Sequence, residues 1–361
     1  MEITAIDTVS RTIPFGDAFP VSYESHAGTE HLFVRLRTDT DHVGYGEGTA
    51  LPWFTGDVGE GLEAVVDRYL ASNVEGETLS AATTATRKFI DKFPGAPGAK
   101  AAVEMALLDL SAKQAEVPLS TLLGSRIRES VPVTQVIPAL SPAAAADRVA
   151  EAAAGGFRSF KVKADGDVEG DVERIDAVTT ALPDDGIVRV DANTGWRRYN
   201  RAKRVIDRLE HPDRIEYIEQ PVATHRIDDM RRLWEATDIP VYADESFAGP
   251  DDVAEHPDAV AGCHLKLAKA GSLERIVEMG RIASRREMRV SVVSAFGTSL
   301  DATANLHVAA VLDNLSAGAE LCTGLAAEDP TTPSLPLASE VKIPSRPGIG
   351  VELDDRLFEA R

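Results

Sequence analysis

Five short apolar stretches decide the fold of this 361-residue chain: FKVK at 160–163, IVRVD at 187–191, IEYIE at 215–219, IPVYAD at 239–244 and CHLK at 263–266. Each ends in a charged residue, in order Lys163, Asp191, Glu219, Asp244 and Lys266, and successive residues are 28, 28, 25 and 22 positions apart. One strand followed by one helix uses about this much chain, so the spacing predicts successive βα units of a parallel barrel. The strand ends of such a barrel share one face, where barrel enzymes hold their active sites.

The same alternation extends to both sides of these stretches. VPVTQVI at 131–137 is a further strand pattern, and helical patterns begin at Ser141 and near 168 and 198. Later, VSVVS ends at Ser294, and AGAE ends at Glu320, 26 residues further on. The pattern predicts an α/β barrel domain over residues 126–320, with its active site at the strand ends.

Residues 1–125 follow a different pattern. Stretches such as HLFVRLRTD at 31–39 alternate apolar and polar residues like antiparallel strands, and helical patterns cover 57–72, 80–93 and 98–115. We expect an α+β domain here that caps the barrel. The segment 321–361 is rich in Pro and Gly, and we expect it to pack back on this first domain.

Composition excludes several classes of protein. The net charge of −20 argues against nucleic acid and anionic membranes as partners. No apolar run approaches the ~18 residues of a membrane span, and the N-terminus lacks a signal-peptide pattern. Two cysteines make no disulfide framework, which indicates a reducing cytoplasm. The chain has only 10 Lys beside 28 Arg, and this acidic, lysine-poor composition favours adaptation to high salt over a merely acidic protein.

Three carboxylates at successive strand ends predict a metal site. Asp191, Glu219 and Asp244 are hard oxygen donors, which favour Mg²⁺ over zinc, with Mn²⁺ as a possible substitute. A single acidic residue at a strand end is more often a helix cap or an ion-pair partner. Three in register, in the contexts DANTGW, EQP and ADES, favour the metal site.

Lysines flank these carboxylates. Lys161 and Lys163 share one face of a strand because side chains alternate with a period of two. Adjacent like charges and a nearby metal ion lower a lysine pKa from ~10.4 towards neutrality, where lysine acts as a base. Lys266 comes from the opposite side of the barrel and is expected to be a second base, whereas Lys269 is expected at the surface or at a helix start.

With these motifs the chain resembles the enolase superfamily, in the subgroup named for muconate-lactonizing enzyme. The matching motifs are KVK at 161–163, DAN at 191–193, EQP at 219–221, ADES at 243–246, LK at 265–266, GYGEG at 44–48 and AKAAVEMALLDLSAK at 99–113. The resemblance implies a modified TIM barrel of the (β/α)7β type under an N-terminal α+β capping domain, with Mg²⁺ on the three carboxylates. It implies Lys163 and Lys266 as the acid/base pair, Lys161 as the residue that stabilises developing negative charge, and a symmetric homo-oligomer. The mandelate-racemase subgroup has a His–Asp dyad where this chain has Lys266, and is set aside.

The resemblance implies a Mg²⁺-dependent isomerase that acts on a small carboxylate substrate through a metal-stabilised enediolate. Three outcomes of that intermediate stay open. The stretch AELCTGLAAEDP at 319–330 lacks the DxD motif of dipeptide epimerases and is closer to cycloisomerases. Muconate-type cycloisomerisation is therefore placed first, and racemisation or epimerisation of an amino-acid derivative or dipeptide and the o-succinylbenzoate synthase (dehydratase) reaction are the alternatives. A sugar-acid dehydratase would require a His base on a late strand, and no strand end from 290 to 320 supplies one, since His307 lies inside a helical pattern.

Residues 15–30 and 50–56 are the expected lid loops over the barrel mouth. The expected substrate contacts are Phe19, Tyr23, Trp53, Phe54, Asn193, Ser294, Phe296 and Glu320. The aromatic residues are nearly as consistent with ordinary core packing, and Glu320 is alternatively the salt-bridge partner of Lys266 or Lys163. The histidines His26 and His31 are expected to be solvated.

Overall fold

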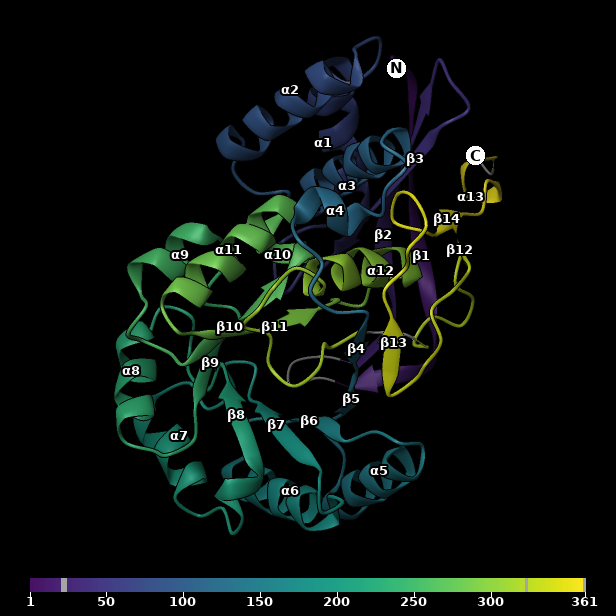
Figure 1. Ribbon diagram of the computed structural model, residues 1–361. Coiled ribbons are helices and arrows are strands. Elements are labelled where there is room, and N and C mark those ends of the chain that lie inside the picture. The colour runs from purple at the N-terminus through teal and green to yellow at the C-terminus, as the bar shows by residue number, and fades with distance from the viewer. Residues whose placement is uncertain (21–24, 322–323, 360–361) are drawn as a thin grey trace.

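A curled parallel sheet surrounded by helices forms the lower two thirds of the molecule in Figure 1, a computed structural model that describes residues 1–20, 25–321 and 324–359. The sheet has the strand order β11-β10-β9-β8-β7-β6-β5. Its strands are β5 (Thr134–Ile137), β6 (Ser159–Lys163), β7 (Ile187–Asp191), β8 (Ile215–Glu219), β9 (Val241–Ala243), β10 (Gly262–Lys266) and β11 (Arg289–Val293). Every neighbouring pair is parallel, as the repeated βα units require.

An irregular segment at 314–320 closes the barrel between the two edge strands. On one side its Glu320 amide donates to the Val292 carbonyl at 2.9 Å, and on the other the Thr134 amide donates to the Ala319 carbonyl at 2.9 Å. Because this segment takes the place of an eighth strand, the architecture is a (β/α)7β barrel.

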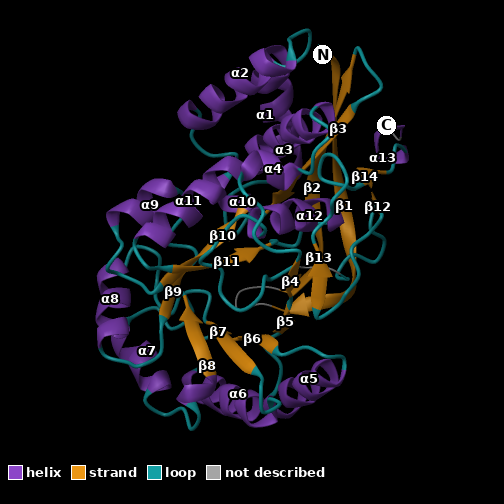
Figure 2. Cartoon of the chain, in the orientation of Figure 1, coloured by secondary structure: helices purple, strands orange, loops and turns teal. Residues whose placement is uncertain are grey.

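Helices on the outside of the barrel connect successive strands (Figure 2). They are α5 (Pro142–Ala154), α6 (Val168–Ala181), α7 (Tyr199–Ile206), α8 (Ile227–Glu235), α9 (Pro250–Glu255), α10 (Leu267–Ala270), α11 (Leu273–Arg285) and α12 (Ser299–Ala309), with the 3-10 turn η3 (Pro212–Arg214) before β8. The buried faces of these helices and the apolar strand residues form one continuous core. Helix α5 begins at Pro142 after Ser141, as the Ser-Pro pair predicts, although the Ser141 side chain makes no capping hydrogen bond.

The N-terminal part consists of an antiparallel sheet and helices. The sheet contains β1 (Ile3–Pro20), β2 (Ser25–Thr38) and β3 (Val43–Ala50). The helices are α1 (Gly59–Val65), the π-helical turn η1 (Val66–Leu70), the 3-10 turn η2 (Ala71–Asn73), α2 (Leu79–Lys92), α3 (Pro97–Gln114) and α4 (Leu119–Leu123).

The motif GYGEG brings the cap sheet against helix α3. A Cβ atom at Gly46 would lie 1.8 Å from the Ala102 carbonyl oxygen, and one at Gly48 would lie 2.0 Å from the Gly98 carbonyl oxygen. Only glycine permits this approach of backbone to backbone. Helix α3 is in turn buried on nearly all sides, because it lies between β3 and the barrel helices α10 and α11.

The C-terminal segment runs along the cap and the barrel edge. It contains β12 (Thr331–Thr332), β13 (Glu340–Lys342), β14 (Glu352–Leu353) and α13 (Arg356–Glu359). Strand β13 pairs with β4 (Ser130–Pro132), and the Gly16 amide of β1 donates to the Leu325 carbonyl at 2.9 Å.

The predicted α/β fold with a modified TIM barrel and an α+β cap is confirmed. Within the residues described, no helix combines the length and the apolar character that a membrane crossing needs. The exact division of the chain at residues 125 and 320 stays a prediction.

Candidate active site

Strand register places the predicted charged residues side by side. Lys163 pairs with Asp191 across β6 and β7, and Asp191 pairs with Glu219 across β7 and β8. Asp244 follows the last residue of β9, and Lys266 is the last residue of β10. All five therefore lie at the carboxyl ends of parallel strands, as the spacing in the sequence predicts.

Lys161 lies deepest and binds three carboxylates. Its Nζ is 2.6 Å from Glu219 Oε2, 2.6 Å from Glu320 Oε2 and 3.0 Å from Asp191 Oδ2. The side chain is 2% exposed. A buried ammonium is stable only when it is paired in this way, and one cation here links two predicted metal ligands.

Lys163 lies nearer the mouth, with a side chain that is 12% exposed. Its Nζ donates to Asp191 Oδ2 at 2.6 Å and to Asn193 Oδ1 at 3.0 Å. The Asn193 amide Nδ2 donates to Glu245 Oε1 at 3.1 Å, and its backbone N–H donates to Asp191 Oδ1 at 2.9 Å. Asn193 therefore holds one lysine and two carboxylates in place from a left-handed backbone position (φ 39°).

Lys266 faces this group from the other side of the barrel. It is ion-paired with Asp244, its Nζ is 3.9 Å from Glu219 Oε1, and it lies 5.3 Å from the centre of the Phe54 ring. Lys269 binds the same carboxylate, with its Nζ 2.8 Å from Asp244 Oδ1. Of the two expected positions of Lys269, the helix start is confirmed, because the residue lies in the first turn of α10, and the surface is wrong, because 4% of its side chain is exposed.

The electrostatic balance of the site differs from the expectation for lysines. Burial alone would lower the pKa of Lys161, but Asp191, Glu219 and Glu320 raise it well above its ordinary value. Burial likewise opposes the charge on Lys266, and Asp244 and Glu219 raise its pKa. For Lys161 and Lys266 the protein groups therefore raise the pKa instead of lowering it towards neutrality, because carboxylates outnumber the ammonium groups around them.

The carboxylates divide into two kinds. Burial opposes ionisation of Asp191 and Asp244, but the neighbouring lysines hold the pKa of each well below its usual value. Burial, followed by repulsion from Asp191, raises the pKa of Glu219 well above its usual value. Glu219 is thus the carboxylate whose charge the protein balances least.

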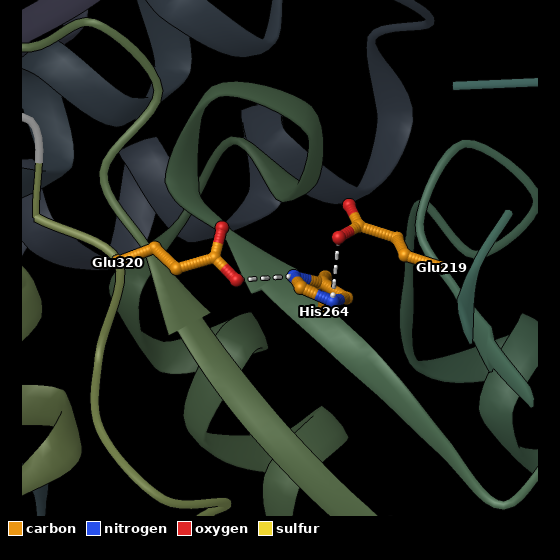
Figure 3. Close-up of side chains that lie close together, drawn as sticks. All are labelled: Glu219, His264 and Glu320. Carbon is orange, nitrogen blue, oxygen red and sulfur yellow. Dashed lines mark ion pairs between the residues drawn. The ribbon is translucent and has the colours of Figure 1, made fainter. Parts of the chain in front are cut away.

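Below the lysines lies a second layer of polar residues, which Figure 3 shows in part: the imidazole of His264 stands between the carboxylates of Glu219 and Glu320. Its Nε2 is 3.1 Å from Glu219 Oε2, and its Nδ1 is 3.9 Å from Glu320 Oε1. Glu320 Oε1 also lies 3.4 Å from Arg189 Nη1 and 3.4 Å from the Tyr217 hydroxyl. Glu320 is 3% exposed and forms its ion pairs with Lys161 and Arg189, rather than with Lys266 or Lys163.

The donor chemistry fits a divalent cation at the strand ends. Asp191, Glu219 and Asp244 are fully buried carboxylates, and neither oxygen of Glu219 accepts an aligned hydrogen bond from the described residues. Oε2 has Lys161 Nζ at 2.6 Å, whereas Oε1 lies 3.9 Å from Lys266 Nζ. A buried carboxylate oxygen without a close partner is costly unless a cation binds it. Within the described part of the chain, the donors that come within 4.8 Å of one another are those of Glu219, His264 and Glu320. Lys161 Nζ lies 2.6 Å from a carboxylate oxygen of both glutamates, so an ammonium already holds that group together.

A hollow of about 400 Å³ opens beside the site, between the barrel and the cap. Its lining includes Asn193, Glu245 and Lys269 from the barrel and Trp53 and Phe54 from the cap loop at 51–56. Trp53 is 73% exposed, so this ring is not a core residue.

The remaining predicted contacts are less clearly placed. Ser294 is fully buried. Phe296 has a positive φ of 61°, and its ring centre lies 5.7 Å from that of Phe15. The side chains of Phe19 and His26 and the whole of Tyr23 lie outside the described residues.

The sequence led us to expect a solvated His31, but this residue is buried. It lies in β2, the central strand of the cap sheet, and its Nδ1 lies 2.8 Å from Oε1 of Glu47 on the neighbouring strand β3.

Sequence reasoning missed Arg189, Tyr217 and His264. Each lies two residues before a predicted site residue, namely Asp191, Glu219 and Lys266, on the same strand. The period of two therefore contained the signal, since a residue two positions earlier points into the same barrel interior one layer deeper.

Comparison with known proteins decides the family. Residues 4–124 match the model of the N-terminal domain of mandelate racemase / muconate lactonizing enzyme, and residues 144–357 match the enolase C-terminal domain-like model. The chain belongs to the enolase superfamily, in the muconate-lactonizing enzyme subgroup. Members of this family are isomerases, and so is this protein.

Two relatives illustrate the activities within the family. The N-succinyl-L-Arg/Lys racemase of Bacillus cereus is 30% identical over 86% of this chain and 84% of its own length. Its crystal structure superposes with a TM-score of 0.93 at 28% identity, over 99% of this chain and 97% of that chain. The chloromuconate cycloisomerase of Cupriavidus necator is 31% identical over 98% of this chain and 97% of its own length.

Proposed function

We propose that this isomerase moves the proton on the carbon next to a substrate carboxylate, as a racemase or epimerase of an amino-acid derivative or dipeptide. The observation that carries the proposal is the pair Lys163 and Lys266, which end β6 and β10, the two strands that flank β7, β8 and β9 in the barrel sheet. Each is held by a different carboxylate, Asp191 and Asp244. A lysine on each side of the substrate carbon is what a proton transfer between the two faces requires.

In the proposed reaction, the lysine on one face is neutral and takes the proton from the substrate carbon. The lysine on the other face is an ammonium ion and gives a proton to the same carbon. One C–H bond breaks and one forms, no electrons are gained or lost, and the configuration is inverted. The two lysines then differ from their starting states by one proton each, which solvent exchange restores.

Asp191, Glu219 and Asp244 would hold a divalent cation, with Mg²⁺ proposed and Mn²⁺ as a substitute. When bound, such an ion stabilises the negative charge that the substrate carboxylate gains, and its charge lowers the pKa of nearby lysines. Lys161 supports the same carboxylate charge from below. Lys161 also fills the space between the two glutamates, which is why we place the cation on the predicted trio.

Cycloisomerisation of a muconate-type substrate is the second candidate. It is supported by the cycloisomerases among the relatives and by the stretch AELCTGLAAEDP at 319–330, which is closer to cycloisomerases than to dipeptide epimerases. We place it second because ring closure needs one proton carrier, and because Glu320, on which the sequence-based preference rested, is engaged by Lys161 and Arg189 inside the barrel. The o-succinylbenzoate synthase reaction has no comparable observation in its favour.

Proton NMR in D₂O tests the proposal. The enzyme is given Mg²⁺ and molar KCl, the salt that its acidic composition predicts it tolerates, with N-acylamino acids, dipeptides and cis,cis-muconate as separate substrates. Deuterium at the α-carbon of an amino-acid derivative, with loss of optical rotation, is the expected result. Lactone formation from muconate with no α-exchange would replace the proposal by the second candidate.

A further inference from the structure

Helix α6 carries a buried pair of opposite charges, Asp171 and Arg174, here called the α6 pair. Asp171 is fully buried, Arg174 is 5% exposed, and Arg174 Nη1 lies 2.8 Å from Asp171 Oδ1. Apolar side chains of similar volume would pack at these positions without the cost of removing two charges from water. Packing alone therefore does not explain the pair, and its other partners indicate its role.

Asp171 binds the loops that follow two neighbouring strands. In the loop after β6, its Oδ1 accepts from the Asp165 backbone N–H at 2.9 Å, and its Oδ2 accepts from the Gly166 N–H at 3.1 Å. In the loop after β7, Trp196 Nε1 donates to the same Oδ2 at 2.8 Å. Trp196 ends the motif DANTGW and is fully buried. One carboxylate thus holds the two loops together.

The two loops also pack directly against each other. Gly166 has a φ of 90°, and a Cβ atom there would lie 3.0 Å from the Gly195 carbonyl oxygen. Arg174 adds a third loop, because its Nε donates to the Leu140 carbonyl after β5 at 2.6 Å, while its Nη2 donates to Asp165 Oδ2 at 2.6 Å. The α6 pair therefore restrains the backbone after three successive strands of the barrel.

These loops position one of the two proposed proton carriers. Lys163 ends β6 directly before the first loop, and its Nζ donates to the side chain of Asn193, in the second loop, at 3.0 Å. A change in the spacing of the two loops would therefore move Lys163 relative to Asn193. Lys266 lies outside this network, because within the described residues no hydrogen bond of the α6 pair reaches β10.

We propose that Asp171 is a positioning residue for Lys163: by holding the loops after β6 and β7 together, it fixes Lys163 for proton exchange with the substrate carbon. This inference rests on the proposed function, because it assumes that Lys163 and Lys266 act on opposite faces of that carbon. A displacement of a reacting group by about 1 Å can lower a rate about 100-fold. Loss of the Asp171 carboxylate should therefore slow proton transfer on the face next to Lys163 and leave the other face nearly unchanged.

The test measures proton transfer on each face separately. It uses the N-acylamino acid or dipeptide that wild type deuterates fastest, and follows by proton NMR the initial rate at which each configuration at the α-carbon loses its proton in D₂O with Mg²⁺. Lys266→Ala keeps Lys163 as the base and so identifies the configuration whose proton faces Lys163. The ratio of the two rates in one enzyme preparation does not depend on the amount of folded enzyme.

Two variants weaken the link between the loops. Asp171→Asn keeps the shape of the side chain but turns an amide NH₂ towards N–H donors, because both oxygens of Asp171 accept. Trp196→Phe removes one of these donors and keeps an aromatic ring. The matched control is Asp176→Asn on the same helix, whose carboxylate accepts from the Glu210 N–H at 2.9 Å, in the segment that precedes β8.

The proposal expects Asp171→Asn to lower the rate on the Lys163 face about 10–100-fold relative to the rate on the Lys266 face. Trp196→Phe should shift the ratio in the same direction, about fivefold, as for the loss of one hydrogen bond. Asp176→Asn should keep the wild-type ratio.

A role in stability alone would lower both rates equally. An unchanged ratio in Asp171→Asn, or in Trp196→Phe if the Asn variant does not fold, would overturn the inference and leave the proposed function standing. If wild type exchanges no α-proton of any N-acylamino acid or dipeptide, the proposed function fails, and the inference fails with it.

Discussion

The strand ends of the barrel and the loop of the cap line the same hollow, but they are built in opposite ways. At the strand ends, charged side chains such as Lys163, Lys266 and Asp191 are at most 12% exposed, and each is held by an oppositely charged neighbour. On the cap side, Trp53 is 73% exposed, and Phe54 approaches Lys266 only through its ring face.

This difference separates two tasks. Buried and mutually paired charges keep a fixed geometry, which suits proton transfer and the binding of a cation. An exposed aromatic loop can adjust its position to the shape of a ligand, which suits a role in substrate selection. The comparison therefore predicts that barrel substitutions change the rate of the chemical step, and that cap substitutions change mainly the substrate preference.

The largest expected effect comes from the two lysines. Lys163→Ala and Lys266→Ala should each lower the rate of isomerisation about 10²–10⁴-fold, since each removes one of the two proton carriers. Mg²⁺ or Mn²⁺ affinity should stay nearly unchanged, as measured by calorimetry. Lys203→Ala, which removes a lysine paired with Asp207 on the surface helix α7, is the matched control. Wild-type rates in either lysine variant would remove the basis of the comparison.

The next effect concerns the packing of the cap sheet against helix α3. Gly46→Ala should destabilise the protein by about 3 kcal/mol, because its Cβ would meet the Ala102 carbonyl oxygen of α3 at 1.8 Å. Chemical denaturation measures the change. Gly16→Ala, where no heavy atom lies within 4 Å of the added Cβ, is the control and should change stability little. Equal stability of the two variants would show that the cap is not packed as closely as the barrel.

A smaller effect is expected from pH at the junction of barrel and cap. His307 on α12 accepts from the Ser120 backbone N–H at 3.2 Å and donates to the Ile349 carbonyl at 2.9 Å, so it is neutral. Burial lowers its pKa from 6.5 to about 4. In the unfolded chain His307 binds a proton below pH 6.5, whereas in the folded protein it does so only below about pH 4. The free energy of unfolding therefore decreases as the pH falls through this range.

The loss attributable to His307 between pH 7 and pH 5 should be about 2 kcal/mol. Chemical denaturation of wild type and of His307→Gln at both pH values isolates the contribution of His307 to the change in the free energy of unfolding. The Gln variant should show a shallower fall in stability over the same range. An unchanged slope in the variant would mean that His307 is not the group responsible.

The smallest effect should come from the cap loop. Trp53→Ala should raise KM about fivefold, near 1 kcal/mol, for substrates with a bulky side chain, and leave kcat nearly as in wild type. A substrate with a methyl side chain should be nearly unaffected. A drop in kcat with unchanged KM would place Trp53 among the residues of the chemical step and erase the contrast between cap and barrel.

Sequence reasoning reached the strand ends because two periodicities act there together. The βα repeat fixes which residues share a face, and the strand period fixes which side chains point inwards. Lys161, Asp191 and Glu219 were found in this way. The burial of Lys269 was misjudged because helix α10 is only four residues long and turns towards the site, which no periodicity in the sequence indicates.

The loops and the deeper layer were less accessible to such reasoning. The Thr298 hydroxyl, at the start of α12, donates to Glu47 of β3 across 251 residues of sequence, and His31 of β2 contacts the same carboxylate. No local pattern in the sequence predicts the longer of these contacts. The roles of Trp53 and Phe54 depend on where the cap rests on the barrel. Salt adaptation, the homo-oligomer and the identity of the metal ion stay predictions.

The most direct test of the two-lysine site is stereospecific exchange in the single-lysine variants. Lys163→Ala and Lys266→Ala are incubated in D₂O with each enantiomer of a substrate that wild type isomerises, and α-deuterium is followed by proton NMR. The account predicts that each variant exchanges the α-proton of one enantiomer only, and that the two variants prefer opposite enantiomers. Exchange of both enantiomers by either variant, or the same preference in both, would contradict the placement of the lysines on opposite faces of the substrate.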